Sequence, residues 1–129
     1  MKLKALLFTT FATLTLTACT TTPKIPELQT GALQEINNLD IHPTATKSKA
    51  TLIKFADRCS IEYTASSPTG KIAEQWAFKG NTVFSGGGAV FAPDGTSKAA
   101  HYDLTKQETL DKFTVLKNKF AKDALEQCE

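Results

Sequence analysis

The strongest constraint on the fold is a run in which apolar and polar residues alternate. Between residues 59 and 65, the apolar side chains Ile61, Tyr63 and Ala65 fall on one face of an extended chain, and polar residues separate them. Successive side chains of a β-strand point to opposite faces, so this pattern predicts a half-buried strand. Such a strand belongs in a sheet with one face on the core.

Turn signals divide the middle of the chain into further short strands. The sequence SPTG at 67–70 predicts a turn that joins two strands in a hairpin. Gly86-Gly87-Gly88 is expected to interrupt a strand with a bulge or a bend. The expected further strands cover residues 51–55, 71–79, 82–85, 89–92 and 97–103.

The C-terminal segment has the periodicity of an amphipathic helix. Its apolar stripe consists of Leu110, Phe113, Leu116, Phe120 and Ala124. Thr105 and Glu108 have the spacing of a capping box, which predicts that the helix begins there. We expect an α+β fold, in which a small antiparallel sheet is packed by this C-terminal helix.

A second, shorter helix is expected before the sheet. Leu28, Ala32, Ile36 and Leu39 recur at helical spacing within residues 26–39. The polar stretch that follows, to residue 49, is expected to be a loop.

The first eighteen residues have the pattern of an export signal. Lys2 and Lys4 precede an apolar run at 5–16, which is too short to span a bilayer comfortably. The sequence LTAC at 16–19 begins with the last residue of this run. This sequence resembles the lipobox of bacterial lipoproteins, with Cys19 as the residue that receives the lipid.

The resemblance implies that residues 1–18 are removed and that Cys19 anchors the chain in a membrane. Members of this family typically carry a diacylglyceryl group and an N-acyl chain, and two or more chains hold a protein stably where one does not. Thr20 follows Cys19 in place of Asp, which by the family's sorting pattern implies the outer membrane. Residues 19–27 then form a tether, and residues 28–129 form a single domain.

Two cysteines remain after Cys19 is assigned to lipid. In an exported protein, Cys59 and Cys128 are expected to form a disulfide. Free thiols or a functional thiol are the alternatives. The two cysteines, with His42 and His101 isolated in sequence, have no recognised metal-ligand spacing.

The charge balance argues against nucleic-acid binding. Removing Lys2 and Lys4 from the 15 basic residues leaves 13, against 13 acidic residues. A neutral chain without a basic run lacks the electrostatic signature of a nucleic-acid-binding protein. No cofactor or metal is expected either.

The glycine run is the feature most easily mistaken for a phosphate-binding loop. No Lys follows Gly86-Gly87-Gly88, as a phosphate-binding loop requires. The run with its neighbours Phe84 and Phe91 is instead a possible binding surface. His101 and Asp103 lack an identified nucleophile, and Trp76 is expected to anchor the core.

These observations favour a non-enzymatic protein of the cell envelope. We expect a small outer-membrane lipoprotein, facing the periplasm or the cell surface, whose domain has a binding or structural role with an envelope protein as partner. The alternative is an inhibitor or immunity protein that acts on a toxin or a wall-degrading enzyme. An envelope hydrolase is a third hypothesis, for which the spacing of the carboxylates gives no support.

Overall fold

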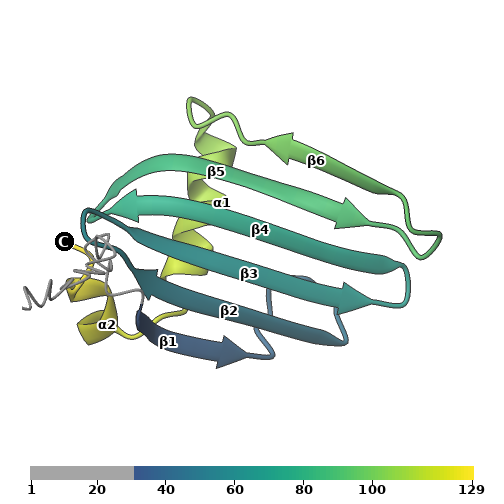
Figure 1. Cartoon of the computed structure of the whole chain (residues 1–129), viewed down its shortest axis with the longest axis horizontal. Coiled ribbons are helices and arrows are strands. Elements are labelled where there is room, and N and C mark those ends of the chain that lie inside the picture. Colours follow the sequence, from purple (N-terminus) through teal and green to yellow (C-terminus); the bar gives the residue numbers. More distant parts are fainter. Residues whose placement is uncertain (1–30) are drawn as a thin grey trace, which may run out of the picture.

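The computed structural model describes residues 31–129, in which six antiparallel strands form one sheet. The strands follow their sequence order, so each pairs with its neighbours in the chain (Figure 1). They are β1 (Gly31–Asn37), β2 (Lys47–Lys54), β3 (Cys59–Ser67), β4 (Gly70–Lys79), β5 (Thr82–Phe91) and β6 (Ser97–His101). The expected antiparallel sheet is confirmed, but the chain is mostly β.

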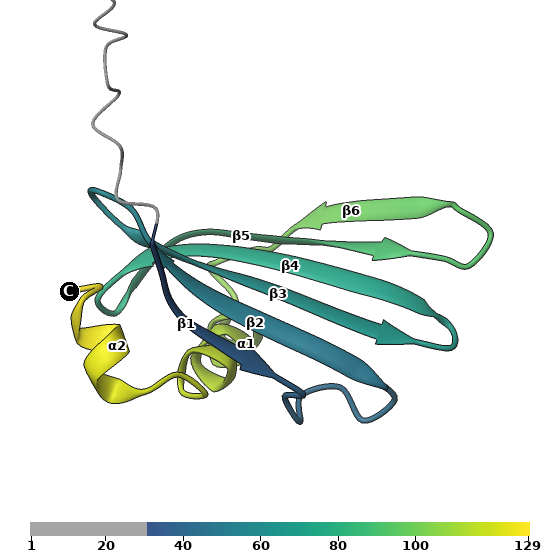
Figure 2. The same cartoon turned by 60° about the horizontal axis from the view of Figure 1, so that its bottom comes forward.

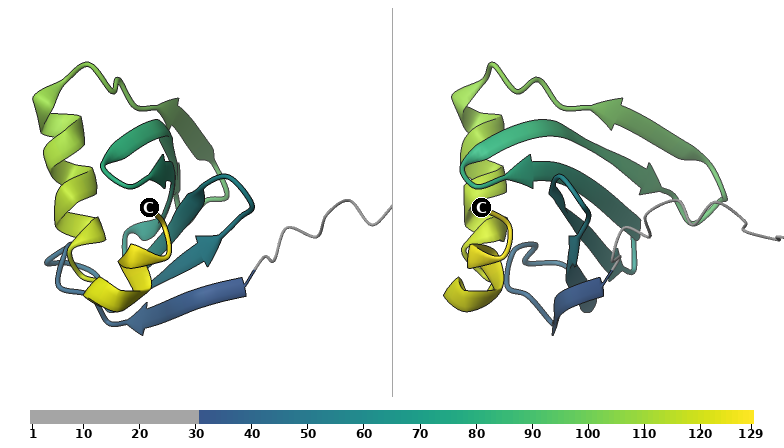
Figure 3. Two further views of the ribbon diagram at one scale, coloured as in Figure 1. Left: turned by 90° about the vertical axis from the view of Figure 1, so that its left-hand side faces the viewer. Right: turned by 60° about the vertical axis from the view of Figure 1, so that its left-hand side comes forward.

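Two short helices complete the domain. Helix α1 (Gln107–Lys117) crosses one face of the sheet, and α2 (Lys122–Glu126) lies at the end where β1 begins (Figure 2). Figure 3 shows α1 on one side of the sheet, and within residues 31–129 no helix lies on the other. We call the side under α1 the core face and the opposite side the outer face. Neither helix of residues 31–129 is long and apolar enough to cross a membrane.

The core lies between α1 and the middle of the sheet. Leu52, Ile61 and Trp76 are fully buried on three adjacent strands. Phe113 of α1 packs against Trp76 and Phe78, with ring centroids 5.4 and 5.2 Å apart. Trp76 therefore anchors the core, as its sequence context predicted, and the alternation at residues 59–65 is confirmed.

The expected N-terminal helix is wrong in the part that the structure describes. Residues 31–37 form β1, which pairs antiparallel with β2, so Ile36 lies opposite Ala50. Pairing with β2 satisfies the backbone and packs the partly buried Ile36 against the core, whereas an isolated short helix is marginal. The expected loop before residue 49 is likewise too long, because β2 begins at Lys47.

The glycine run does not interrupt its strand. β5 is continuous from Thr82 to Phe91, with Gly86 opposite Trp76. A Cβ atom at Gly86 would lie 2.5 Å from the Trp76 ring, so this position needs glycine for close packing and not for a bend. The irregularity in pairing instead falls at Phe84, where the register with β4 shifts.

The C-terminal helix is shorter than expected and is followed by a second one. α1 ends at Lys117, yet Phe120 beyond it remains buried. The expected capping box is wrong: Lys106 is the N-cap and makes no side-chain capping bond. The Thr105 hydroxyl donates to the Asp103 carboxylate instead, which closes a local turn.

The disulfide between Cys59 and Cys128 is confirmed. The two Cα atoms are 5.6 Å apart, and both residues are buried. The bridge joins the start of β3 to the residue that follows α2 and its C-cap. Cys19 and the export signal lie outside the described residues.

Candidate functional site

A shallow groove runs over the outer face of β4, β5 and β6. Its volume is about 760 Å³, and it reaches across to Glu62 and Thr64 on β3. The floor is made by small outer-face residues, which the pairing of the strands brings side by side: Ala73, Ala77, Ser85, Gly87, Ala89 and Ala99. Larger side chains at these positions would fill the groove, so their small size creates it.

Polar groups lie among and beside these floor residues. Gln75 and Glu62 lie opposite each other on neighbouring strands, and His101 lies opposite Gly87. All three side chains belong to exposed residues. The groove therefore combines an apolar floor with an amide, a carboxylate and an imidazole, a composition suited to binding through shape and a few hydrogen bonds.

The three glycines of β5 have different neighbours. All three line the groove through their backbone. A Cβ at Gly87 would lie 3.1 Å from the Ala100 carbonyl and 3.7 Å from the His101 ring. At Gly88 it would collide with the Tyr102 hydroxyl. Only Gly87 thus leaves its side-chain space on the outer face, while Gly86 and Gly88 make room for rings of the core face.

Two exposed phenylalanines lie at the two ends of β5. Phe84 is 45% exposed at the bulge, and the Arg58 guanidinium sits 5.1 Å from its ring centroid. Phe91 is 42% exposed at the other end. Neither ring lines the groove itself, so the proposed surface of Phe84, Gly86–Gly88 and Phe91 stays a prediction, with the glycines as its middle.

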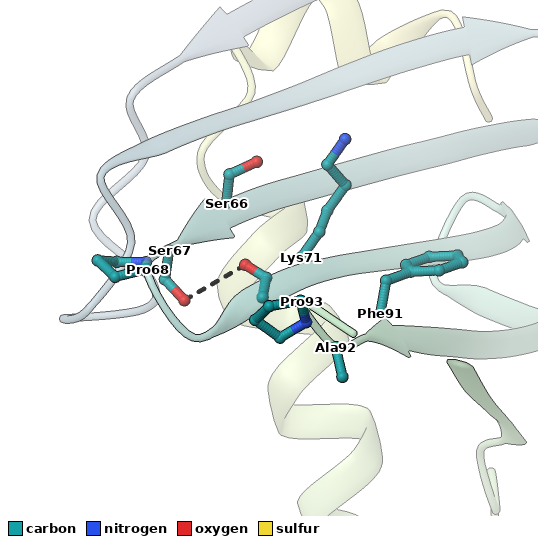
Figure 4. A pocket seen from close by; sticks show the side chains of 8 residues that line it. Ser66, Ser67, Pro68, Lys71, Phe91, Ala92 and Pro93 are labelled. Carbon is teal, nitrogen blue, oxygen red and sulfur yellow. Dashed lines mark hydrogen bonds between the residues drawn. The ribbon is translucent and has the colours of Figure 1, made fainter. Parts of the chain in front are cut away.

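Phe91 lines a second hollow at the tip of the sheet (Figure 4). This hollow of about 570 Å³ lies between the turn that joins β3 to β4 and the turn that joins β5 to β6. Lys71 lies opposite Phe91 on the neighbouring strand. Gly70 has φ +142°, and a Cβ there would collide with the Phe91 carbonyl, so the close approach of the two turns requires glycine.

A buried carboxylate lies on the core face. Glu74 interrupts the apolar pattern of β4, and the structure pairs it with Lys112 of α1 at 2.9 Å. The indole Nε1 of Trp76 donates to the same carboxylate at 3.3 Å. A buried charge is tolerated when it is paired and hydrogen-bonded, so this cluster explains the interruption that the sequence pattern showed.

Both tyrosines of the chain lie near this carboxylate. Tyr63 lies opposite Glu74 on β3, and the Tyr102 hydroxyl is 3.4 Å from the Lys112 ammonium. Burial, reinforced by the negative charge of Glu74, raises the pKa of Tyr63 and the pKa of Tyr102. Burial opposes the charge on Lys112, but the hydrogen bond and charge of Glu74 outweigh it and raise the pKa of Lys112.

The histidine and carboxylate singled out in the sequence have different surroundings. His101 is exposed beside Gly87, and the Asp103 carboxylate accepts from the backbone and hydroxyl of Thr105. Those hydrogen bonds lower the pKa of Asp103. Across residues 31–129, no three His, Cys, Asp or Glu side chains gather to hold a metal ion.

The alanines and the serine of the groove floor escaped sequence reasoning. Ala73, Ala77, Ala89 and Ala99 are each one residue in an alternating strand, and only the register brings them together. The available signal was the small size of Ser85, Gly87 and Ala89 at alternate positions of β5, away from the core-facing positions. Comparison with protein-family models, with curated proteins and with solved structures gave no match.

Proposed function

We propose that this chain is a lipid-anchored protein of the bacterial outer membrane, with a binding role and no catalytic one. The single observation that carries the proposal is the division of the three cysteines. One ends a lipobox-like sequence, and the other two are joined in the folded domain. Disulfides persist in oxidising compartments, which agrees with export of the chain.

The binding role is supported by the contrast between the buried carboxylate of Glu74 and the exposed groove. Glu74 is 5% exposed and is held by Lys112 and Trp76 under α1. The groove instead offers a floor of small residues with exposed polar groups among and beside them. We propose that a second macromolecule of the envelope lies on this outer face.

Replacing the proposed acylation site tests the anchor. We expect Cys19→Ser to abolish incorporation of a labelled fatty acid and to remove the protein from the outer-membrane fraction, because the acyl chains on Cys19 are the proposed anchor. A Cys59→Ser/Cys128→Ser double variant is the matched control and should still be labelled. Mass spectrometry that finds an unmodified amino terminus in the native protein would refute the anchor.

Site-specific crosslinking tests the groove. A photoreactive residue at Ala89, on the groove floor, should give one dominant adduct with an envelope component in intact cells. The same residue at Thr114, which is exposed on α1, serves as the control and should give none. Equal adducts from both positions would show that the groove is not the contact surface.

A further inference from the structure

The two edges of the sheet are protected unequally. At the β1 edge, a register shift at Leu33 interrupts the pairing with β2, and the Gln34 side chain accepts a 2.8 Å hydrogen bond from the Ala121 backbone before α2. Bulges and covering segments are common devices against edge-to-edge pairing. β6 has an unbroken register with β5, and its five residues are all exposed.

The pairing of β6 determines which of its backbone groups face outward. Tyr102 N–H donates to the Gly86 carbonyl at 2.9 Å, and Ala92 N–H donates to the Thr96 carbonyl at 2.8 Å. Hydrogen-bonded pairs alternate with non-bonded pairs along an antiparallel ladder. Residues 98 and 100 therefore bond to β5.

The remaining three residues of β6 turn their backbone groups away from the sheet. These are Ser97, Ala99 and His101, and each presents an N–H and a C=O to an edge that no strand within residues 31–129 covers. Their side chains lie on the outer face, with His101 beside Gly87 at the groove. The edge is thus a short template for one further antiparallel strand.

We propose that β6 of a second copy of this chain pairs with this edge, across a twofold axis at Ala99. Antiparallel pairing about that axis places Ala99 opposite its own counterpart and Ser97 opposite His101 of the other copy. Those are the residues whose backbone groups face outward, so every outward N–H and C=O within β6 obtains a partner. A twofold interface of this kind closes on itself and does not propagate into fibres.

The side chains of β6 suit a second copy better than an arbitrary strand. Lys98 is its one formally charged residue at neutral pH, and this register sets it opposite Ala100 of the other copy and not opposite Lys98. Like charges directly opposite would destabilise the pair. Ser97 meets His101, so a hydroxyl faces an imidazole that can accept or donate a hydrogen bond.

The proposed interface is small, so its formation at low protein concentration depends on attachment of both copies to the same membrane. Five paired residues bury less than the roughly 1,200 Å² of a stable interface. The lipid of the proposed function, on which this step rests, would raise the effective concentration toward the mM range. The axis is perpendicular to the sheet, so both outer faces point the same way and the two grooves become neighbours across it.

Thiol crosslinking of the acylated full chain tests the pairing. Chains with Ser97→Cys are mixed with chains carrying His101→Cys in phosphatidylethanolamine–phosphatidylglycerol vesicles and treated with a short bis-maleimide. We expect mixed dimers about tenfold above those from a matched mixture of Thr64→Cys and Gln75→Cys chains, which places thiols on the same face away from the edge. Equal yields from the two mixtures would overturn the proposal.

A proline at the axis tests the backbone bonds. Ala99→Pro deletes an outward N–H and leaves the bonds to β5 in place, so mixed dimers should fall to the control level while the domain stays folded by circular dichroism. If the proline unfolds the domain, Ala99→Lys is the replacement test. It sets like charges opposite each other across the axis, so mixed dimers should again fall to the control level. Retention of dimers in the folded variant would refute the pairing.

The proposed dimer and the proposed lipid anchor can be refuted independently of each other. The same mixture without the lipid, concentrated to about 1 mM, should still give mixed dimers because the contacts lie within the domain. If the lipid-free mixture gives dimers and no lipid is found on the native chain, the proposed function is refuted and the pairing at the β6 edge is retained. Adducts only with a different protein in cells, and none between copies, would assign the edge to another partner and overturn self-association.

Discussion

Single residues of β5 determine how closely the core packs. Gly86 lies against the ring of Trp76, which is itself in contact with Phe113 of α1. Gly88 lies against the hydroxyl end of Tyr102, whose ring centroid is 5.0 Å from that of Trp76. The two glycines therefore allow three aromatic rings to share a space that side chains on β5 would otherwise occupy.

We expect Gly86→Ala to destabilise the domain by about 1–3 kcal/mol, because the added methyl group overpacks the core against a fixed indole ring. The melting temperature should fall by several degrees, which calorimetry measures. Gly87→Ala is the matched control, since its Cβ meets the Ala100 carbonyl at 3.1 Å on the open face, and it should cost less. Equal losses from the two variants would contradict the packing argument.

At the scale of elements, the last helix depends on a covalent tie. α2 has only five residues, none of them buried, and an isolated helix of that length is not stable in water. Cys128 holds its end to β3, and the Gly80 N–H donates to the Cys128 carbonyl at 2.7 Å. The fold of the C-terminal segment therefore depends on the bridge more than on local helix propensity.

Loss of this bridge should affect the C-terminus first. The bridged residues are 69 positions apart, and closure of such a loop stabilises by about 4 kcal/mol in the chain-entropy model. We expect Cys59→Ser/Cys128→Ser to lower the unfolding free energy by a similar or smaller amount and to raise amide exchange in α2 above that in α1. Uniform exchange in the two helices, or thiols in the native protein that label without reduction, would contradict this account.

The residues at which the helices begin and end were the least predictable from the sequence. The apolar stripe after residue 110 correctly identified Phe113, Leu116 and Phe120 as buried. It could not show that the chain leaves the helix after Lys117, because Phe120 reaches the core from a turn as well as from a helix. The capping box was wrong for a different reason: α1 begins at Gln107 with Lys106 as its N-cap, and Thr105 belongs to the preceding turn, where its hydroxyl donates to Asp103.

At the scale of the whole molecule, the cluster under α1 links stability to alkaline pH. The pKa of Tyr63 and the pKa of Tyr102 are raised by burial and by Glu74. A raised pKa in the folded state means that the folded protein keeps its protons longer than the unfolded chain. Stability from these groups is complete below the usual tyrosine pKa of about 10 and is lost as pH rises through the higher folded value.

Absorbance at 295 nm should report this linkage directly, since the chain has only two tyrosines. We expect ionisation to begin above the pH at which free tyrosine titrates, and to coincide with loss of the near-ultraviolet circular dichroism of Trp76. Tyr63→Phe should leave one delayed titration, that of Tyr102. A native domain in which both tyrosines ionise near pH 10 would contradict the burial argument.

The sequence by itself determined which face of β3 lies on the core, the core role of Trp76 and the pairing of Cys59 with Cys128. Those features follow from a local period of two, from side-chain size and from the small number of cysteines. Only the tertiary structure decided that residues 31–37 form a strand, that the glycines continue β5, and that scattered small residues form a groove. These depend on register between distant segments, because a residue's partners across a sheet are not encoded in its own neighbours along the chain.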